Sequence, residues 1–400
     1  MNPANVQGAS KFAPLRILMV TARFLPETGG IETHVYQVAT RLAALGHDVT
    51  VLTTDRSASE RSVEMLKDVR VIRTPAWPRK RDYYFAPGVN SEVRNGDWDV
   101  VHIQGCHTLV PVLAMAAAIS GGKKFIVTFH SGGHSSAWRN RIRRAQWALL
   151  SPLFRRASHL VGVSRFEASS FSRSMSIAPQ RFSVVYNGAE MPKVARPTGE
   201  RRKLIASVGR LEKYKGHHRI IRAMPNLLRR DPDLFLRIVG QGPYKQELQA
   251  LVERLGLSHH VEIAGVPPGE RQEMADILSK SALVVLLSEY EAHPIAVMEA
   301  LACGAKVLVT NISGLRDLVE DGLATAVESD ASDAVVADAV WNELQNDSDG
   351  RAVQLPTWET CVESLESIYL SVVKGQGEAE GVPAKSGARE DIVSTAQVGS

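Results

Sequence analysis

Short apolar runs alternate along the chain with stretches whose apolar residues recur every three or four positions. The run Arg16–Thr21 predicts a buried strand, and the apolar positions of residues 31–45 predict a helix that Gly46 ends. Further strands are predicted at 49–53, 69–72, 100–103, 125–128, 160–163 and 183–186. Because continuous apolar runs are typical of strands covered on both faces, this alternation predicts an open, parallel α/β sheet.

The alternation is interrupted once and then begins again. Residues 191–203 are rich in charged residues and proline and predict a linker. New strands are predicted at 204–208, 235–239, 261–263, 282–287 and 306–309. We therefore expect two doubly wound domains, 15–190 and 204–355, with ligands bound between them at the carboxyl ends of the strands. The polar segment 1–14 and the tail 374–400 lack apolar periodicity and are expected to be disordered.

Composition places the chain among ordinary globular proteins. Of its 400 residues, 44% are hydrophobic and 22% are charged. No apolar run reaches the roughly 18–20 residues of a membrane span, and the first residues lack the apolar core of a signal peptide. The three cysteines, Cys106, Cys303 and Cys361, match neither a disulfide framework nor a zinc site. These features predict a cytoplasmic protein.

The net charge of +4 is unevenly distributed. Residues 1–190 contain 24 lysines and arginines against 13 acidic residues, whereas the remainder contains 23 against 30. Much of the excess lies between Arg139 and Arg181, where nine arginines accompany only one acidic residue, Glu167. This asymmetry predicts an anionic partner for the first domain.

The segment Arg139–Arg156 mixes these arginines with large apolar residues that include Trp147 and Phe154. Such a segment could lie on an anionic membrane surface as an amphipathic helix. The alternative is a solvated helix whose apolar side packs on its own domain. Nucleic acid is not an expected partner, because the chain contains no recognisable nucleic-acid-binding module.

The clearest chemistry lies in residues 288–304, which follow an apolar run that predicts a buried strand. Pro294 suits the first position of the next helix, because it has no N–H to leave unpaired there. Glu291 lies just before this helix, and Glu299 lies about one turn inside it. The segment thus places two carboxylates on either side of a predicted helix start.

The backbone amides of Ile295 and Ala296 would point out of that helix start, where the helix dipole favours an anion. A phosphate flanked by Glu291 and Glu299 indicates a phosphorylated ligand with hydroxyl groups on both sides. This description fits a nucleotide sugar. The alternative is that the two glutamates lie on the surface of an ordinary helix.

Two cations follow the first strand of the second domain. Arg210 and Lys215 lie in the turn after residues 204–208, at the expected carboxyl edge of the sheet. Cleavage of a sugar–diphosphate bond leaves negative charge on a phosphate, and two fixed cations would stabilise that charge without a metal. The alternative for each is a solvated loop residue.

Three positions in the first domain also point to the cleft. Gly29 and Gly30 lie between the first strand and the first helix, where their amides could approach an anion, although a tight turn would explain them as well. His130 follows the strand 125–128 and could contact a sugar or assist proton movement. A structural histidine is the alternative.

Several other activities are not supported. Gly240 and Gly242 imitate a dinucleotide fingerprint, but Lys245 occupies the place of its third glycine. The chain has neither a P-loop nor a His/Cys metal spacing, so nothing in it requires a metal or another cofactor.

Taken in order, these motifs resemble the retaining, nucleotide-sugar-dependent glycosyltransferases of the GT-B fold, of the family 4-like group 1 type. The resemblance extends over about residues 15–373. The matching pieces are Gly29-Gly30-Ile31-Glu32, Gly46-His47-Asp48-Val49, Thr128-Phe129-His130, Asn187-Gly188, Gly209-Arg210-Leu211, Lys215-Gly216, Gly240 with Gly242, and the Glu291/Glu299 pair. The family implies two Rossmann-like domains facing across a cleft, with a last helix, 356–373, that packs back on the first domain.

The resemblance also implies roles for the residues. Arg210 and Lys215 would hold the donor diphosphate, with help from amides at Gly29, Gly30, Ile295 and Ala296 and close backbone approach at Gly240. Glu299 would bind the ribose and Val266 the base, while Glu291 and His130 would contact the donor sugar. The transfer would be metal-independent. It would retain the anomeric configuration through attack on the face that the diphosphate leaves.

The chain departs from the family pattern after the first glutamate, where Ala292, His293 and Pro294 replace the usual Gly-Phe-Gly. The donor-sugar pocket near His293 is therefore expected to be reshaped. We expect a hexosyltransferase that transfers from a UDP- or GDP-linked sugar to a saccharide or lipid-linked acceptor. The implied pathway is cell-surface polysaccharide or glycolipid synthesis. Peripheral attachment to the inner face of the plasma membrane is left open. The alternatives are a sugar phosphorylase, a sugar-nucleotide epimerase, or an inactive sugar-nucleotide-binding protein.

Overall fold

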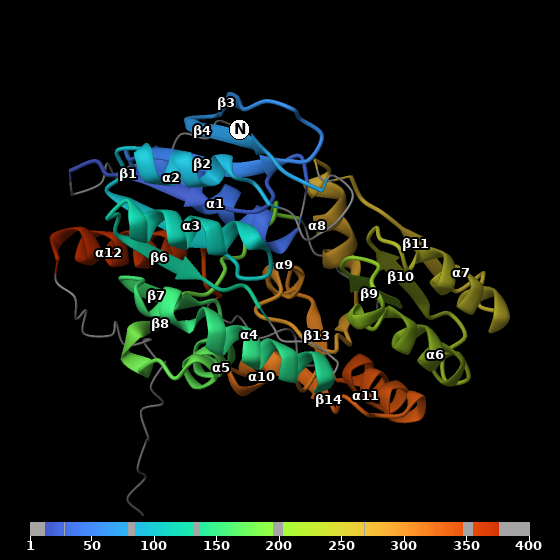
Figure 1. The fold of residues 1–400 in the computed structure, drawn as a ribbon. Coiled ribbons are helices and arrows are strands. Elements are labelled where there is room, and N and C mark those ends of the chain that lie inside the picture. The colour runs from blue at the N-terminus through green and yellow to red at the C-terminus, as the bar shows by residue number, and fades with distance from the viewer. Residues whose placement is uncertain are drawn as a thin grey trace, which may run out of the picture.

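The computed structural model describes residues 13–27, 29–78, 85–131, 137–194, 203–267, 269–346 and 355–375, with only the backbone path given for 137–145. Nearly all of the two predicted disordered ends and most of the predicted linker lie outside these ranges. The described chain forms two α/β domains side by side, each built on its own sheet (Figure 1).

The first domain contains an eight-stranded sheet of order β3-β4-β2-β1-β5-β6-β7-β8. Its strands are β1 (Arg16–Val20), β2 (Asp48–Asp55), β3 (Ser62–Leu66), β4 (Val69–Pro75), β5 (Val100–Gln104), β6 (Phe125–Thr128), β7 (His159–Gly162) and β8 (Phe182–Val184). All neighbours are parallel except β3, which pairs antiparallel with β4. The sequence did not predict β3, because its side chains are largely exposed at the sheet edge and form no apolar run.

Helices cover both faces of this sheet, because alternate strand residues point to opposite sides. In β1, Leu18 packs with helices α2 (Gly88–Asn95), α3 (Leu109–Ser120), α4 (Ala137–Arg155) and α5 (Arg165–Met175). Its neighbours Ile17 and Met19 pack on the other face with α1 (Gly30–Ala44). A short 3₁₀ turn, η1 (Pro179–Arg181), precedes β8.

The second domain contains a fully parallel six-stranded sheet of order β11-β10-β9-β12-β13-β14. Its strands are β9 (Leu204–Val208), β10 (Phe235–Val239), β11 (Val261–Ala264), β12 (Leu283–Leu286), β13 (Lys306–Thr310) and β14 (Thr325–Val327). One face is covered by α6 (His217–Leu228), α7 (Lys245–Arg254) and α11 (Asp333–Gln345). The other is covered by α8 (Arg271–Lys280), α9 (Ile295–Ala302) and α10 (Ser313–Glu320).

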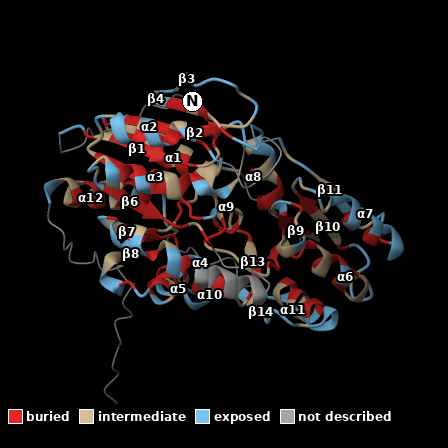
Figure 2. Ribbon diagram, in the orientation of Figure 1, coloured by how far each residue is buried: buried red, intermediate tan, exposed pale blue. Residues whose placement is uncertain are grey.

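Buried residues fill both sheets and the inner faces of the helices (Figure 2). The two doubly wound, Rossmann-like α/β domains predicted from the alternation are thus confirmed. Each sheet has one point where the strand order reverses, beside β1 in the first domain and beside β9 in the second. Ligands of such sheets bind at these switch points, outside the carboxyl ends of the strands.

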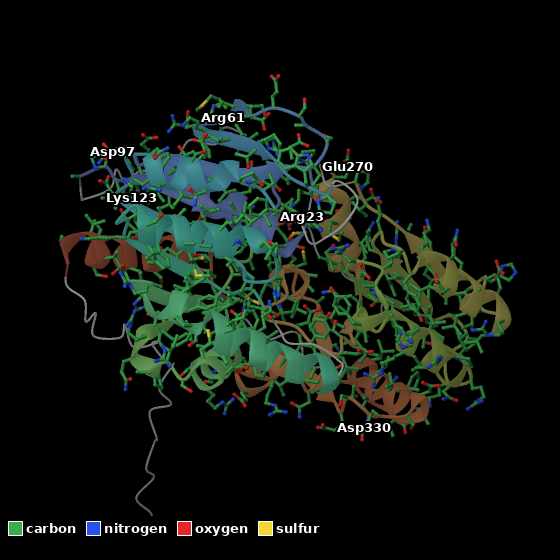
Figure 3. All side chains as sticks on the ribbon, viewed as in Figure 1. Arg23, Arg61, Asp97, Lys123, Glu270 and Asp330 are labelled. Atoms are coloured by element: carbon green, nitrogen blue, oxygen red, sulfur yellow. The ribbon has the colours of Figure 1, made fainter. Side chains whose placement is uncertain are left out.

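The carboxyl ends of the strands in the first sheet face the second domain. Asp97 and Lys123 come just before β5 and β6, and both lie at the edge of the first domain that is remote from the second (Figure 3). Arg23 comes just after β1 and lies toward the second domain (Figure 3). The position of the expected ligand is therefore between the domains.

The last helix, α12 (Trp358–Lys374), belongs spatially to the first domain. It lies beside α1, and its buried residues Leu365 and Tyr369 are part of the core on that face of the first sheet. The chain therefore crosses between the domains twice. The two crossings touch where the Ala189 amide donates to the carbonyl of Pro356 at 3.0 Å.

A second contact between the domains joins α5 to α10. Arg165 at the start of α5 donates to the carbonyl of Asp317 at 3.1 Å and pairs with Asp321 at 3.0 Å. The amide of Phe166 donates to the Asp317 carboxylate at 3.2 Å. Burial raises the pKa of Asp317, while these donors oppose the rise. The domains are thus held at the crossings and at this polar contact.

None of the helices in the described ranges combines the length and apolar character needed to cross a bilayer. In α4, Trp147 and Phe154 are buried in the core of the first domain and contact each other edge to face. The expectation that these two side chains form the apolar edge of a membrane-binding helix is wrong. Leu149, in contrast, is 79% exposed. The side chains of residues 139–145 lie outside the described part.

Candidate functional site

A buried ion pair lies at the carboxyl edge of the second sheet. Lys215 Nζ is 2.5 Å from Glu291 Oε1, and their side chains are only 15% and 11% exposed. Lys215 ends the 3₁₀ turn η2 (Lys213–Lys215) after β9, and Glu291 follows the neighbouring strand β12, so the switch point brings them together. Ser288 also donates to Glu291 Oε1 at 2.8 Å. Two residues predicted from separate motifs thus form one site.

Arg210 lies nearer the solvent than Lys215. Its side chain is 56% exposed, and its one described ion pair is with Glu212 at 3.2 Å, in the same loop. Its charge nevertheless reaches Glu32 in the first domain, where it opposes the upward shift that burial gives to the pKa of that carboxyl. Arg210 is therefore an exposed cation of the second domain whose charge acts on a residue of the first.

Helix α9 begins at Ile295, one residue later than predicted, because Pro294 is extended and serves as the N-cap. The carbonyl of Pro294 accepts from Val297 and Met298, which leaves the amides of Ile295 and Ala296 without acceptors in the helix. Ile295 packs against the apolar cluster of the first domain that includes Phe24 and Val35. The start of α9 therefore faces the first domain.

Glu299 lies one turn into α9 and is nearly buried. Its carboxylate accepts from Arg271 Nη1 at 2.7 Å. Burial raises the pKa of Glu299, and the charge of Arg271 opposes the rise. Arg271 also donates to the carbonyl of Glu190 at 2.7 Å, in the segment that joins the domains. Arg271 was not predicted, since no motif marks it and only its fold position brings it to Glu299.

Two other predicted positions in the second domain have surroundings that the structure describes. A Cβ on Gly240 would lie 1.9 Å from the carbonyl oxygen of Gly209, so this glycine allows the ends of β9 and β10 to approach closely. Val266 follows β11, is half-buried, and packs against the core beside α8 and α9. Their contacts with a donor stay predictions.

Gly314 packs closely against the loop that carries Glu291. The Gly314 amide donates to the carbonyl of Glu291 at 2.9 Å, and a Cβ on Gly314 would lie 1.6 Å from the carbonyl oxygen of Ala292. We expect Gly314→Ala to displace this loop, to cost about 2 kcal/mol of unfolding free energy, and to lower transfer at least tenfold. Thermal denaturation and initial rates measure both effects.

Gly269→Ala is the matched control, because its Cβ would meet open space. A Gly314→Ala variant that matches this control in stability and rate would contradict the role given to the close contact.

The first domain contributes its own helix start. Gly29 is the extended N-cap of α1 and Gly30 its first residue, while Thr28 lies outside the described residues. The side chain of Glu32 folds back over this turn, so that a Cβ on Gly29 would lie 2.4 Å from its Oε2. A carboxylate thus lies at the place where the sequence predicts an anion.

His130 lies at the carboxyl end of β6 in the left-handed backbone conformation, with φ of +56°. Its Nε2 is 2.8 Å from Gln104 Oε1, and its ring contacts that of His34 at a centroid distance of 4.6 Å. Burial is the main reason that the pKa of His130 is well below its usual range, and the nearby histidines lower this pKa further. The ring is therefore neutral.

Glu167 supports the turn after His130. Its buried carboxylate accepts from the backbone amide of Ser131, and from that of Val163 at 2.7 Å. Burial raises the pKa of Glu167 to about 7, against the effect of these donors. Glu167 was not assigned to the site from the sequence. The one signal for it is that Glu167 is the only acidic residue between Arg139 and Arg181.

Asn187 joins the two domains beside these residues. Its Oδ1 lies 2.8 Å from His34 Nδ1, and its Nδ2 donates to the carbonyl of His293 at 3.0 Å. Burial lowers the pKa of both histidines to about 4. The Asn187-Gly188 turn predicted from the sequence is therefore a polar link between the domains.

The described residues contain no group of three or more His, Cys, Asp or Glu side chains placed to hold a metal ion. The site instead combines a buried Lys–Glu pair, a more exposed arginine, a buried Glu–Arg pair and two helix starts between two Rossmann-like domains.

Two family models match consecutive parts of the chain. Residues 28–191 match Glycosyltransferase Family 4, and residues 192–352 match Glycosyl transferases group 1. The chain belongs to the group 1 glycosyltransferases of the GT-B fold. The group 1 family and the GT-B fold predicted by the resemblance are thus confirmed.

Curated relatives of this glycosyltransferase match over most of its length. It is 28% identical to the glycogen synthase of Mycobacterium tuberculosis, over 92% of this chain and 97% of the relative. It is 26% identical to the GDP-mannose:cellobiosyl-diphosphopolyprenol alpha-mannosyltransferase of Xanthomonas campestris, over 82% and 86% of the two chains.

Solved structures support the fold of this glycosyltransferase. HepE from Anabaena, in complex with UDP and glucose, has a TM-score of 0.69 at 18% identity and covers 89% of this chain and 100% of its own. Sucrose-phosphate synthase from Thermosynechococcus elongatus has a TM-score of 0.67 at 18% identity, with 90% and 97% covered.

Proposed function

We propose that this glycosyltransferase is a retaining, metal-independent hexosyltransferase. It moves a hexosyl group from a nucleotide-diphosphate sugar to a saccharide or lipid-linked acceptor, in the cytoplasmic assembly of cell-surface polysaccharide or glycolipid. The observation that carries the proposal is the buried Lys215–Glu291 pair, because it puts a cation and a hydrogen-bond acceptor together at the switch point of the second sheet.

In this proposal the donor diphosphate lies between Lys215 and Arg210. The free amides at Ile295 and Ala296 bind its oxygens from the second domain, and those near Gly30 bind from the first, once the Glu32 side chain moves aside. Negative charge develops on the β-phosphate as the bond to the sugar breaks. Two fixed cations and two helix starts stabilise that charge.

The remaining contacts with the donor are assigned to residues of both domains. Glu299 accepts hydrogen bonds from the ribose hydroxyls, and the backbone at Gly265 and Val266 meets the base. Glu291 accepts from hydroxyls of the donor sugar, and His130 contacts the same sugar from the first domain. Oxygen acceptors suit this ligand, because each sugar hydroxyl needs a hydrogen-bond acceptor when it leaves water.

The proposed transfer occurs on one face of the sugar. The acceptor hydroxyl oxygen bonds to the anomeric carbon on the side from which the diphosphate leaves. The proton of that hydroxyl passes to a departing phosphate oxygen, and the electron pair of the broken C–O bond leaves with the nucleoside diphosphate. Because bond breaking and bond formation share one face, the anomeric configuration is retained.

A nucleotide panel tests this proposal. HepE was solved with UDP, and the name of the Xanthomonas relative includes GDP-mannose, so UDP and GDP are the expected bases. We expect one of UDP, GDP and ADP, and its sugar conjugate, to raise the melting temperature equally with and without EDTA. NMR of the product is expected to show the anomeric configuration of the donor.

No stabilisation by any nucleotide would contradict the proposal, and loss of binding in EDTA would contradict metal independence. Donor turnover without an acceptor would indicate an epimerase, and turnover that requires inorganic phosphate would indicate a phosphorylase. Binding without any turnover would indicate an inactive binding protein.

We also propose that α4 brings the enzyme to an anionic membrane surface that carries a lipid-linked acceptor. The support is the arginine-rich segment Arg139–Arg156, the exposed Leu149, and the diphosphopolyprenol acceptor in the name of the Xanthomonas relative.

We expect the protein to float with phosphatidylserine-containing liposomes at low salt and to be released at high salt. Leu149→Ser should weaken flotation several-fold, whereas Leu255→Ser, which changes an exposed leucine of the second domain, should not. Absence of flotation at low salt would rule the proposal out.

A further inference from the structure

A chain of buried side chains joins the last helix to His130. Tyr369 Oη in α12 lies 2.6 Å from His102 Nδ1 in β5. His102 Nε2 lies 2.7 Å from Thr128 Oγ1 and 3.1 Å from Gln104 Nε2. Gln104 Oε1 in turn lies 2.8 Å from Nε2 of His130. Every member except His130, which is half-buried, is at most 2% exposed.

Gln104 determines the direction of these hydrogen bonds, because its amide has one end that donates and one that accepts. The Gln104 NH₂ group faces His102 Nε2, so that nitrogen accepts, and the N–H of His102 is on Nδ1, which donates to Tyr369. The Gln104 carbonyl oxygen faces His130 Nε2, so that nitrogen carries the N–H and donates.

Both imidazoles have a single N–H, because burial holds the pKa of His102 and of His130 well below the usual range. With the hydrogen of His130 on Nε2, its Nδ1 retains a lone pair. A ring in this state accepts a hydrogen bond from a hydroxyl and offers no N–H at Nδ1 to an oxyanion. It therefore suits the sugar part of a donor, not its diphosphate.

We propose that Gln104 is a positioning residue that holds His130 in the Nε2–H tautomer, so that Nδ1 accepts from a hydroxyl of the donor sugar. The lone pair of His102 Nε2 accepts from the Gln104 NH₂ group and favours this orientation of the amide, while Tyr369 accepts from Nδ1–H of His102. Tyr369 comes from α12, so the helix that returns to the first domain takes part in arranging the site. This inference rests on the proposed function only for the identity of the hydroxyl, since the tautomer belongs to the protein alone.

Nitrogen NMR of the full-length protein with ¹⁵N-labelled histidine tests the tautomer directly. The His130 signals are assigned by their loss in His130→Gln. At about pH 8, where Glu167 is ionised and the His130 ring is neutral, we expect Nδ1 of His130 to appear as an unprotonated nitrogen and Nε2 as a protonated one. A proton on Nδ1 in the wild-type protein would overturn the proposal, since the Gln104 amide would then point the other way.

Two variants of Gln104 separate positioning from simple packing. Gln104→Leu removes the acceptor, so both His130 tautomers should be seen, and kcat should fall about tenfold, the value of one hydrogen bond, with little change in donor KM. Gln104→Glu keeps an acceptor and adds a negative charge, which raises the pKa of His130. Its activity should therefore fall at a higher pH than that of the wild type, whose own acid limb includes the titration of the neighbouring Glu167.

Gln246→Leu is the matched control, because Gln246 is exposed on α7 in the other domain. Retention of a single tautomer and of wild-type kcat in Gln104→Leu would overturn the proposal. An acid limb in Gln104→Glu at the same pH as in the wild type would overturn it as well. Failure of the proposed function would look different. The tautomer and its loss in Gln104→Leu would then still be seen, while the wild-type protein would turn over no nucleotide sugar.

Discussion

Lys215→Ala is expected to lower kcat/KM for glycosyl transfer about 10³-fold while the protein stays folded. The substitution removes the buried cation next to Glu291, where we place the β-phosphate of the donor. Charge that develops on the leaving group would then face Arg210 alone, and Arg210 is more than half exposed, so its charge is partly screened by water. The loss should appear mainly in kcat, because the charge on the leaving phosphate is greatest in the transition state.

Folding should survive this change for a structural reason. Glu291 keeps its hydrogen bond from Ser288 at 2.8 Å when the lysine is removed, so the carboxylate is not left without a donor. Initial rates and thermal denaturation on the same preparation separate the two effects. Lys213→Ala is the control, because Lys213 is an exposed lysine of the same 3₁₀ turn. A Lys215→Ala enzyme within tenfold of this control would refute the role given to Lys215.

Glu299→Ala is expected to reduce transfer to less than about one hundredth of the wild-type rate at low donor concentration. The nearly buried carboxylate would no longer be present to accept from the ribose hydroxyls, and those hydroxyls would lose their partner on entering the site. Unlike the lysine variant, this one should show its defect mainly in donor KM. Calorimetric titration with the nucleoside diphosphate measures it without the chemical step.

Two further variants keep this second prediction specific. Arg271→Met removes the partner at 2.7 Å but leaves the Glu299 carboxylate, so it shows how much of the defect comes from breaking the ion pair. Glu253→Ala removes an exposed glutamate of α7 and should bind the nucleotide like the wild type. If Glu299→Ala binds the nucleotide as tightly as Glu253→Ala, Glu299 does not hold the ribose.

The two-domain fold could be predicted because strand signals are local. β12, and β1 after Arg16, are covered on both faces, so their residues are apolar without interruption and can be recognised without knowledge of their neighbours. β3 was missed for the same reason. It lies at the edge of the sheet, is exposed along most of its length, and is a strand only because β4 pairs with it.

The candidate site could be predicted only in part. Lys215 and Glu291 each follow a predicted strand, so the expectation that parallel strands share a carboxyl edge placed them in one region. The ion pair itself depends on β9 and β12 being neighbours, which no local pattern states. Arg271 and Gln104 carried no signal, because each acts through a residue far away in the chain, Glu299 and His130.

The surface helix shows the opposite error. The arginines of α4 suggested that the apolar residues between them face a membrane, but Trp147 and Phe154 face the core of their own domain. A helical pattern shows that one side is apolar. It cannot show what covers that side, because a protein core and a lipid surface favour the same side chains.

The sequence by itself determined the number of domains, their α/β class and the family, because these depend on apolar periodicity and on motifs that lie within a few residues of one another. The tertiary structure alone decided which motifs meet. It joined Lys215 to Glu291, tied Glu299 to Arg271 at the connection between the domains, and linked α12 to His130 through His102 and Gln104. These contacts bridge long separations along the chain. Their partners are set by strand order and by the return of the last helix, which only the packing of the whole fold determines.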